Sequence, residues 1–464
     1  MKTKYWKRRD LLKTIGTAAF GAAISQPAWS GNQESMVLDL KKDPRYKKPG
    51  KPLTAIILGA GGRGHVYAAY AEKYPDELNI IGVAEPIPFR RERIAERFKI
   101  NRKYQWVTWE HALDIPKFAD VAIITMPDHL HYRPALQAME VGYDLLLEKA
   151  MAQTWQQCVD IYKQSKKHDR IVAICHVLRY TSYFRKMKEV IESGVLGDIV
   201  SVQHLEPVEH IHMSHSFVRG NWRNSKESTP MIISKSCHDT DILRWVIGKS
   251  CKRVTSFGSL KHFREDAAPT GSTARCSDGC AAESSCPYSA LRIYLENKTW
   301  LWHLAIPDNE DGTILQALKN GPYGKCVYRS DNDVVDHQVM NMEFDEEITV
   351  AFSMEALTSY GGRRTRIFGT KGDLAGDMNE LVISDFLSGK EEKWDASKHI
   401  EFKSAHGGGD HGLVHDFIQA VIQHDESLLT SNIEASMESH LMGFMAEESR
   451  LNNGEVLAVN LDLE

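Results

Sequence analysis

Residues 54–64 read TAIILGAGGRG, an apolar run that leads directly into a cluster of glycines. The apolar run predicts a short strand that is buried on both faces. A helical stretch over residues 65–73 follows, and a second strand-like run, residues 78–84, ends on Glu85. The spacing Gly-x-Gly-x-x-Gly between a strand and a helix, with an acid about 20 residues on, is typical of dinucleotide-binding domains.

Each glycine of this turn has a physical reason to be there. Gly59 permits a tight turn, Gly61 leaves space for a pyrophosphate, and Gly64 lets the helix pack closely on the strand. The pyrophosphate would rest on the helix N-terminus, where free N–H groups and the helix dipole favour negative charge. We therefore expect these three residues, together with Gly62 and Arg63, to bind the cofactor.

Glu85 indicates which dinucleotide is bound. Its carboxylate can accept hydrogen bonds from the adenosine ribose and would repel a 2′-phosphate, which favours NAD over NADP. Arg90 and Arg91 lie close behind Glu85 and weaken that preference. NAD is therefore the expected cofactor, with NADP the lesser alternative.

Strands and helices continue to alternate along the next part of the chain. Strands are expected at 120–126, 143–147 and 171–175, and helices at 130–141 and 154–167. This alternation predicts a parallel, doubly wound sheet, and thus an N-terminal Rossmann domain over residues 52–176. Longer β-rich runs, such as 199–205 and 348–356, then replace the alternation.

Two further motifs lie at strand ends of this domain. Thr125-Met126-Pro127 ends one strand and is followed by His131, and Glu148-Lys149-Ala150 ends the next. Together with the glycine turn they resemble the Gfo/Idh/MocA oxidoreductases, the group that contains glucose–fructose oxidoreductase and inositol dehydrogenase. The resemblance covers nearly everything after the N-terminal leader, although family members usually have Glu-Lys-Pro in place of Glu-Lys-Ala.

The resemblance implies an architecture and roles for individual residues. It implies an α/β protein in which the Rossmann domain precedes a C-terminal α+β domain, residues 177–464, with an open, mostly antiparallel sheet. Because that domain often forms a subunit interface in the family, we expect a homo-oligomer. Lys149 would lie beside the nicotinamide ribose and the reacting carbon, and the cofactor site would include Pro127, His131 and Glu148.

A helix is predicted to begin near Ser228-Thr229-Pro230 and to end at Gly248. On that helix Lys235, His238 and Asp241 recur at i, i+3 spacing and so share one face. The resemblance implies that the histidine is the general base that takes a proton from a sugar hydroxyl. Histidine suits this task because its ordinary pKa lies near neutral.

The family's usual aspartate one turn before this histidine is replaced by Ser234. Either Lys235, Asp239 or Asp241 is therefore expected to orient and tune the imidazole, or the base is tuned in a different way.

Other polar residues are expected to line the substrate pocket. Residues 218–223 combine two guanidinium groups with an aromatic ring, which suits sugar hydroxyls and carboxylates. The full set of substrate candidates is Arg179, Tyr180, Arg219, Trp222, Arg223, Lys235, Asp241 and His337. The histidines at 210, 212 and 215 are spaced too loosely to predict a metal site.

A Gly- and Ser-rich insert, residues 267–287, contains Cys276, Cys280 and Cys286. Because the insert has few core-forming residues, we expect a covalent or metal crosslink. One option is a structural zinc with three thiolate ligands and His262 or Cys251 as the fourth. The other is a disulfide, permitted in an oxidising compartment, which leaves one thiol over. Of the two we expect the zinc.

The N-terminus resembles a twin-arginine export signal. Residues 7–13 read KRRDLLK, a mildly apolar stretch covers residues 14–24, and Ala28-Trp29-Ser30 offers a cleavage site. We therefore expect residues 1–30 to be removed after the twin-arginine translocase has exported the folded protein to the periplasm.

The composition is that of an ordinary folded protein, with 42% hydrophobic and 26% charged residues among 464. A formal net charge of −5 calls for neither nucleic acid nor an anionic membrane as a partner. No apolar run after residue 30 is long enough to span a bilayer.

Export constrains the chemistry, because an enzyme exported in its folded state keeps the cofactor that it already holds. Our leading hypothesis is an oxidoreductase for a sugar, glycoside or polyol whose bound NAD is recycled in place, with His238 as base and Lys149 positioning the oxygen. A redox-neutral, NAD-dependent glycoside hydrolase or lyase is the first alternative. A non-catalytic sugar-binding protein is the second.

Overall fold

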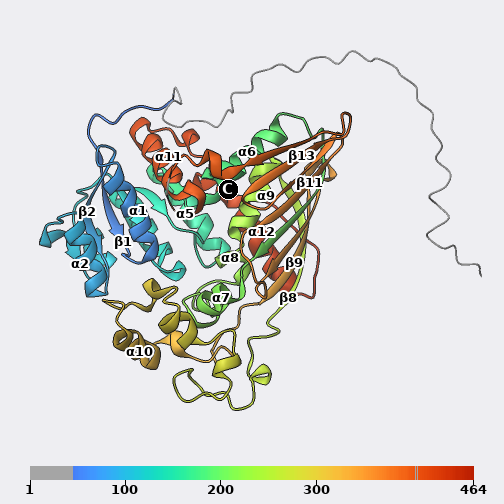
Figure 1. The fold of residues 1–464 in the computed structure, drawn as a ribbon. Coiled ribbons are helices and arrows are strands. Elements are labelled where there is room, and N and C mark those ends of the chain that lie inside the picture. The colour runs from blue at the N-terminus through green and yellow to red at the C-terminus, as the bar shows by residue number, and fades with distance from the viewer. Residues whose placement is uncertain (1–44, 403, 405, 464) are drawn as a thin grey trace, which may run out of the picture. The chain divides into compact units, whose positions relative to one another are not determined.

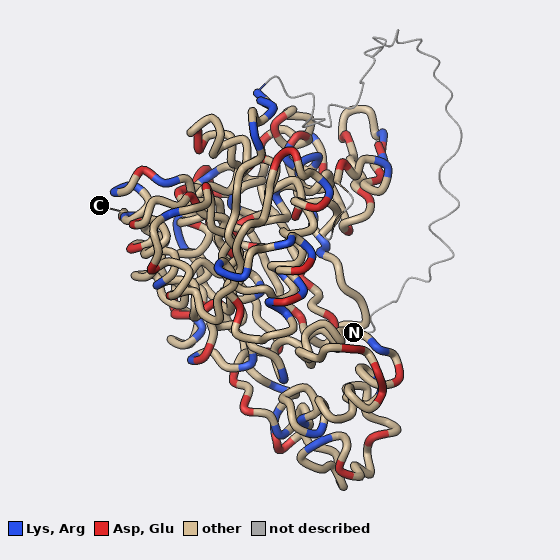
Figure 2. The backbone as a smooth tube through the Cα atoms, turned by 90° about the vertical axis from the view of Figure 1, so that its left-hand side faces the viewer, with Lys and Arg blue, Asp and Glu red and all other residues tan. Residues whose placement is uncertain are grey.

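The computed structural model describes residues 45–463 with the exception of 403 and 405. The expected export signal and its cleavage site lie outside the described residues. Within the described part of the chain, no helix has both the length and the apolar character needed to cross a lipid bilayer. Lys and Arg are interspersed with Asp and Glu along the chain (Figure 2), in keeping with the small net charge.

The first sheet of the described residues has six strands in the order β3-β2-β1-β4-β5-β6 (Figure 1). Its strands are β1 (Leu53–Leu58), β2 (Leu78–Ala84), β3 (Gln105–Trp106), β4 (Val121–Ile124), β5 (Asp144–Leu147) and β6 (Val172–Ile174). All neighbouring pairs run parallel. This arrangement confirms the doubly wound Rossmann sheet predicted from the alternation.

Successive residues of a strand point to opposite sides of the sheet. Because strands β1, β4 and β5 are almost entirely apolar, both faces of the sheet must be buried, and helices cover both. They are α1 (Gly62–Lys73), α2 (Pro88–Arg97), α3 (Trp109–Leu113), α4 (Tyr132–Val141), α5 (Trp155–His168) and, from much later in the chain, α11 (Gly409–Gln423). Ile57 of β1 lies in one core with Tyr67 of α1 and Phe417 of α11. Ile56 lies in a second core with Met139 of α4. The C-terminal part of the chain thus returns to the first domain.

The second sheet has nine strands within the described residues, in the order β14-β13-β12-β11-β7-β10-β9-β8-β15. They are β7 (Ile199–Pro207), β8 (Cys251–Ser259), β9 (His337–Phe344), β10 (Thr349–Glu355), β11 (Arg364–Gly369), β12 (Gly372–Gly376), β13 (Glu380–Asp385), β14 (Glu391–Asp395) and β15 (Leu457–Ala458). The pair β7 and β10 is parallel and the other pairs are antiparallel. The expected open, mostly antiparallel sheet is confirmed.

One face of the second sheet packs against helices (Figure 1). The helices are α6 (Ser182–Glu192), α8 (Met231–Ser234), α9 (Cys237–Ile247) and α12 (Ile433–Leu451), and the short α7 (His210–His212) lies between β7 and α8 in the chain. Val202 of β7 and Met340 of β9 are buried in the shared core. Val339, the neighbour of Met340 in β9, points the other way and is exposed.

The prediction of a single helix between residues 228 and 248 is wrong in one respect. Two helices, α8 and α9, meet at a break that contains Lys235 and Ser236. Gly248 ends α9 in the left-handed conformation, as predicted from the sequence. His238 and Asp241 therefore share a helix, whereas Lys235 lies at the break before it.

The chain between β8 and β9 forms an insert, residues 260–336, with a small hydrophobic core of its own. It contains α10 (Asp311–Asn320) and helical turns at Leu291–Glu296 and Leu301–Leu304. Its core consists of Ala290, Ile293, Tyr294, Leu301, Leu304, Ile314, Leu318 and Tyr323. We call this segment the β8–β9 insert. It approaches α2 of the first domain, where Arg93 lies over the Trp302 ring (Figure 1).

The glycine turn yields a stability prediction. A Cβ added at Gly64 would lie 2.3 Å from the carbonyl oxygen of Gly59, so helix and strand must separate to admit it. Gly64→Ala is expected to lower the free energy of unfolding by about 1–3 kcal/mol, measured by denaturant titration. Gly312→Ala is the matched control, because that helical glycine has open space around its Cβ position. It should leave stability unchanged or raise it by up to about 1 kcal/mol, and equal effects of the two changes would contradict the packing argument.

Candidate active site

The glycine turn leaves room for a phosphate group. Gly59 adopts a φ of +100°, which other residues rarely adopt. A Cβ at Gly61 would meet nothing closer than the Nη1 atom of Arg90 at 4.0 Å, so the space above this residue is open. Glu85 accepts hydrogen bonds from the N–H groups of Ala60 (2.8 Å) and Ile87 (3.0 Å). Open space at the N-terminus of α1 fits the pyrophosphate of a dinucleotide.

Arg63 and Glu148, both expected in the cofactor site, lie in contact. The guanidinium of Arg63 donates to Glu148 Oε1 at 2.5 Å and to Asp410 Oδ1 at 2.6 Å, and the Tyr67 hydroxyl donates to the same Glu148 oxygen. Burial opposes ionisation of Glu148 and Asp410, but the charge of Arg63 and the hydrogen bonds to each carboxylate, with Lys149 beside Glu148 and His406 beside Asp410, together outweigh burial and lower the pKa of both carboxyls. The network joins α1, the end of β5 and α11.

His131 fixes the turn that carries Lys149. Its Nδ1 lies 2.7 Å from the carbonyl oxygen of Ala150, and its Nε2 lies 2.8 Å from that of Met126. Pro127 follows Met126 directly after β4, and the peptide bond between Lys149 and Ala150 is cis. The two motifs that were noted separately in the sequence are therefore one structural unit.

Lys149 faces the break between α8 and α9. Its Nζ donates to the carbonyl oxygen of Ser234 at 2.6 Å and lies 5.9 Å from the centre of the Trp222 ring. His238 is buried beside it, and its Nδ1 has no hydrogen-bond partner within the described residues. Burial lowers the pKa of His238 well below its ordinary value, and the charges of Lys149 and Arg363 lower it further. A neutral imidazole with a free nitrogen can accept a proton.

Asp241 does not reach His238 directly. Its carboxylate forms a bidentate ion pair with Arg179, at 2.8 Å to Nε and 2.6 Å to Nη2, and both side chains are buried. It also faces His176, whose Nε2 lies 3.5 Å from Oδ1. The His176 ring lies 6.1 Å from that of His238 by ring centres. His176 is therefore a neighbour of both Asp241 and the candidate base.

Asp239 and Lys235 also have other partners. Asp239 binds Arg363 at 2.5 Å and His204 at 3.1 Å. Lys235 forms an ion pair with Glu206 at 3.0 Å. Neither of these contacts involves the imidazole of His238.

The remaining substrate candidates are bonded within the protein. Their pairs are Tyr180–Ser431, Trp222–Asp128, Arg223–Asp331 and His337–Asp336. Arg219 is buried and donates to the carbonyl oxygens of Lys325 and Tyr288, each at 2.7 Å. Of this set, Trp222 is the residue that the structure places against Lys149.

Several histidines near the site carried no clear signal in the sequence. The ring of His176 lies 5.3 Å from that of His440 on α12. His212 stacks on Trp300 at 4.9 Å, and its pKa is lowered by burial and by the charges of Lys235, His215 and Lys149. Because these contacts join segments far apart in the chain, no local spacing could reveal them.

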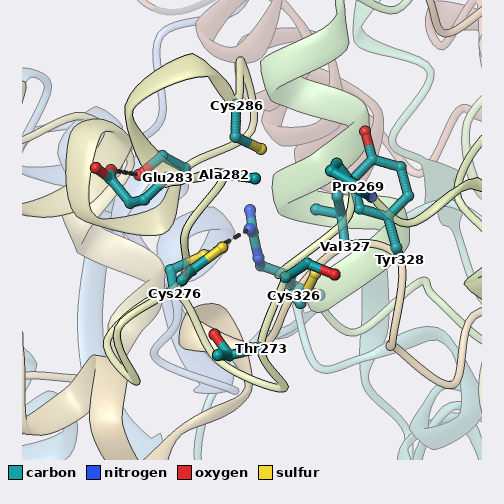
Figure 3. Close-up of a pocket in the computed structure, with 13 residues that line it drawn as sticks. Pro269, Thr273, Cys276, Ala282, Glu283, Cys286, Cys326, Val327 and Tyr328 are labelled. Carbon is teal, nitrogen blue, oxygen red and sulfur yellow. Dashed lines mark hydrogen bonds between the residues drawn. The ribbon is translucent and has the colours of Figure 1, made fainter.

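The cysteine-rich segment forms a pocket, but not the expected crosslink. Cys276, Cys280 and Cys286 line it together with Cys326, and Arg219 lies 3.8 Å from the Cys276 sulfur (Figure 3). All eight cysteines are free thiols, so the disulfide is not formed.

The expected zinc site is not supported either. Within residues 45–463, apart from the two that are not described, no group of three His, Cys, Asp or Glu side chains is placed to hold a metal ion. The two expected fourth ligands lie elsewhere: Cys251 begins β8, where its N–H binds Glu438, and His262 packs against Tyr288 and Tyr328. The fourth thiol of the pocket, Cys326, lies well beyond the cysteine-rich stretch of residues 267–287, so its spacing from the other three thiols could not reveal the contact.

Comparison with known proteins places this geometry in a family. The model of the Gfo/Idh/MocA oxidoreductase family's NAD-binding Rossmann fold matches residues 53–176, and the model of its C-terminal alpha/beta domain matches residues 188–457.

Individual relatives are distant. The putative oxidoreductase YteT of Bacillus subtilis is 23% identical over 310 residues, which are 64% of this chain and 71% of that protein. The 2,7-anhydro-N-acetylneuraminate hydratase of Escherichia coli is 24% identical over 152 residues, 32% of this chain and 40% of that protein. An inositol dehydrogenase homolog from Azotobacter vinelandii, solved with NADH and myo-inositol, has a TM-score of 0.63 at 12% identity, with 89% of this chain and 99% of that chain covered. At this identity the last comparison shows the fold alone.

The Arg63 network yields a pH-dependent prediction. Arg63→Leu leaves two buried carboxylates without their cation, so unfolding should become easier by about 3–5 kcal/mol at neutral pH. The lowered pKa values of Glu148 and Asp410 contribute stability above about pH 4, which is lost as the pH falls through the folded-state values. The difference between wild type and variant should therefore shrink in acid.

The control for this experiment is Arg253→Leu, which removes an exposed ion pair with Glu343 on the second sheet. It should cost less than about 1 kcal/mol at any pH. If the difference in stability between wild type and Arg63→Leu did not change with pH, this would contradict the role given to the carboxylates of Glu148 and Asp410.

Proposed function

The chain belongs to the Gfo/Idh/MocA oxidoreductase family, and from that premise we propose that it oxidises a CH–OH group of a sugar, glycoside or polyol and retains its NAD throughout the cycle. That it is an NAD-binding oxidoreductase follows from the family. The proposed oxidation of a CH–OH group is supported by the buried Nδ1 of His238. This nitrogen has no hydrogen-bond partner among the described residues, and its ring lies close enough to Lys149 for that charge to lower its pKa.

His238 and Lys149 have separate roles toward one substrate hydroxyl group. Neutral His238 accepts the hydroxyl proton, because its lowered pKa keeps the imidazole uncharged at neutral pH. Lys149 stabilises the negative charge that develops on the oxygen, and the exclusion of water strengthens this interaction. When bound at the glycine turn, the nicotinamide supplies the hydride acceptor. The Ser234 carbonyl holds the ammonium group of Lys149 in place until substrate binds.

The redox-neutral alternative keeps the same residues. In it, oxidation of a ring hydroxyl makes the neighbouring C–H acidic, and elimination with loss of that proton expels the aglycone as an alcohol. In a hydrolase water then adds to the resulting double bond, whereas a lyase leaves it, and in both cases the hydride returns to the carbonyl carbon of the same sugar. One relative is named a hydratase, and hydration involves no net change of oxidation state. Membership of an enzyme family removes the third hypothesis, a non-catalytic sugar-binding protein.

Three further expectations remain proposals. The twin-arginine signal and export to the periplasm concern residues that the structure does not describe. A homo-oligomer would use the open face of the second sheet, where Phe257 and Val339 are exposed.

Substrate turnover without added cofactor tests the proposed function. The purified protein is denatured to measure bound nicotinamide, and intact protein is offered free sugars, polyols and glycosides. We expect bound NAD and its reduction by a free sugar or polyol without cleavage. Release of the aglycone with no net reduction would favour the redox-neutral alternative instead. A protein that neither holds NAD nor binds added NAD would contradict both.

Variants of the two catalytic candidates test the mechanism. His238→Asn should slow turnover by about a hundredfold to ten-thousandfold and remove the acid limb of the pH profile, which should lie below about pH 6.5 in the wild type. Lys149→Met should also slow turnover, and the two losses should not add because both groups act on one oxygen.

NAD content should be unchanged in His238→Asn, which lies on the second domain. His337→Asn is the matched control, since this histidine binds Asp336 at the start of β9 and should tolerate the change within a few-fold. If His238→Asn kept near-normal turnover, or if His337→Asn lost turnover, a residue other than His238 would be the general base.

A further inference from the structure

We propose that Trp302 and His303 of the β8–β9 insert form a clasp that binds the pyrophosphate of the dinucleotide from the side opposite the glycine turn. The proposal rests on the cofactor retention proposed above. It gives that retention a physical basis, because the bound phosphates would then be enclosed between two parts of the chain.

The clasp residues lie against the first residue of α1. A Cβ built on Gly62 would be 3.0 Å from the indole Nε1 of Trp302 and 3.8 Å from Nε2 of His303. The Trp302 ring also meets His65 edge-on, at 4.6 Å between ring centres, and Arg93 stacks over it at 5.4 Å. An indole N–H and an imidazole are therefore placed beside the helix end on which a dinucleotide rests its phosphates.

The groups around the clasp favour an anionic ligand. Nδ1 of His303 and Nε2 of His65 are buried and have no hydrogen-bond partner within the described residues. Burial lowers the pKa of both rings. The charges of Arg97, Arg93 and Arg90 lower it further at His65, and that of Arg90 does so at His303. Neutral imidazoles keep one N–H donor each, and the nearby guanidinium groups favour a negatively charged partner.

The position of Arg90 also favours a pyrophosphate ligand. Its Nη1 is the atom nearest to the Cβ position of Gly61, and its charge acts on His303 and on Tyr323 of the insert. This places the guanidinium at the glycine turn, where the pyrophosphate would rest. Arg90 is therefore a candidate pyrophosphate ligand at the end of the turn that Glu85 also binds through the N–H of Ala60.

The clasp is continuous with the substrate side of the site. His215 stacks on Trp300 and meets His303, each at 4.8 Å between ring centres. Trp300 stacks in turn on His212, whose ring is close enough to Lys149 for that charge to lower its pKa. A row of aromatic rings therefore runs from the glycine turn to Lys149, so enclosure of the phosphates and of the substrate would occur together.

Retention of NAD tests the clasp without any substrate. Protein loaded with NAD is passed through gel filtration, the nicotinamide still bound is measured, and dissociation of NADH is followed by its fluorescence. Trp302→Ala and His303→Ala should each weaken binding by about tenfold to a hundredfold, the loss expected for a hydrogen bond to a charged group. Trp302→Phe keeps the ring without the N–H and should fall between wild type and Trp302→Ala.

Phe386→Ala, which removes an exposed aromatic ring beyond β13, is the matched control and should retain NAD as the wild type does. The thermal midpoints of the apo forms verify folding. Equal retention in wild type and both alanine variants would overturn the clasp while leaving the proposed function intact, and tighter binding in Trp302→Ala would show that the indole blocks the site. A wild type that binds no NAD would instead contradict the proposed function.

Discussion

The geometry of the site depends on the ion pairs between the half-buried guanidinium of Arg63 and two buried carboxylates. The guanidinium neutralises Glu148, at the end of β5, and Asp410, at the start of α11, from its own position in the glycine turn. Charges buried in this way are stable only as a set, since loss of one leaves the others uncompensated. Because Lys149 follows Glu148 directly, the same pairing fixes the glycine turn and the candidate catalytic lysine relative to each other.

The second domain contributes the neutral base His238 to the site, whereas the first domain contributes the cationic Lys149. His238 is held neutral by burial and by nearby cations, whereas the ammonium group of Lys149 donates to a backbone carbonyl. An uncharged base and an ammonium group beside the same oxygen are what the removal of a hydroxyl proton requires. The acids that might have oriented the base, Asp239 and Asp241, are instead paired with Arg363 and Arg179. They hold α9 in place rather than tuning the imidazole directly.

Local signals in the sequence were sufficient to predict the fold. Residues 54–64 carry the strand, the turn and the helix start in one stretch, and the resemblance supplied the second domain. Features set by contacts between distant segments were not predictable. Arg179 and Asp241 both had reason to contact substrate, and only the folded chain brings them together. Cys326 joins the other thiols through the packing of the β8–β9 insert, and the helix break at Lys235 follows no glycine or proline.

The central claim is that His238 and Lys149 act on one substrate oxygen beside a retained NAD. The most direct measurement is a crystal structure of the enzyme with bound NAD and a substrate that it turns over. The account predicts that one hydroxyl oxygen lies about 2.6–3.2 Å from Nδ1 of His238 and from Nζ of Lys149, with its carbon facing the nicotinamide. A hydroxyl group bound instead by His337 or Tyr180, with His238 out of reach, would contradict it.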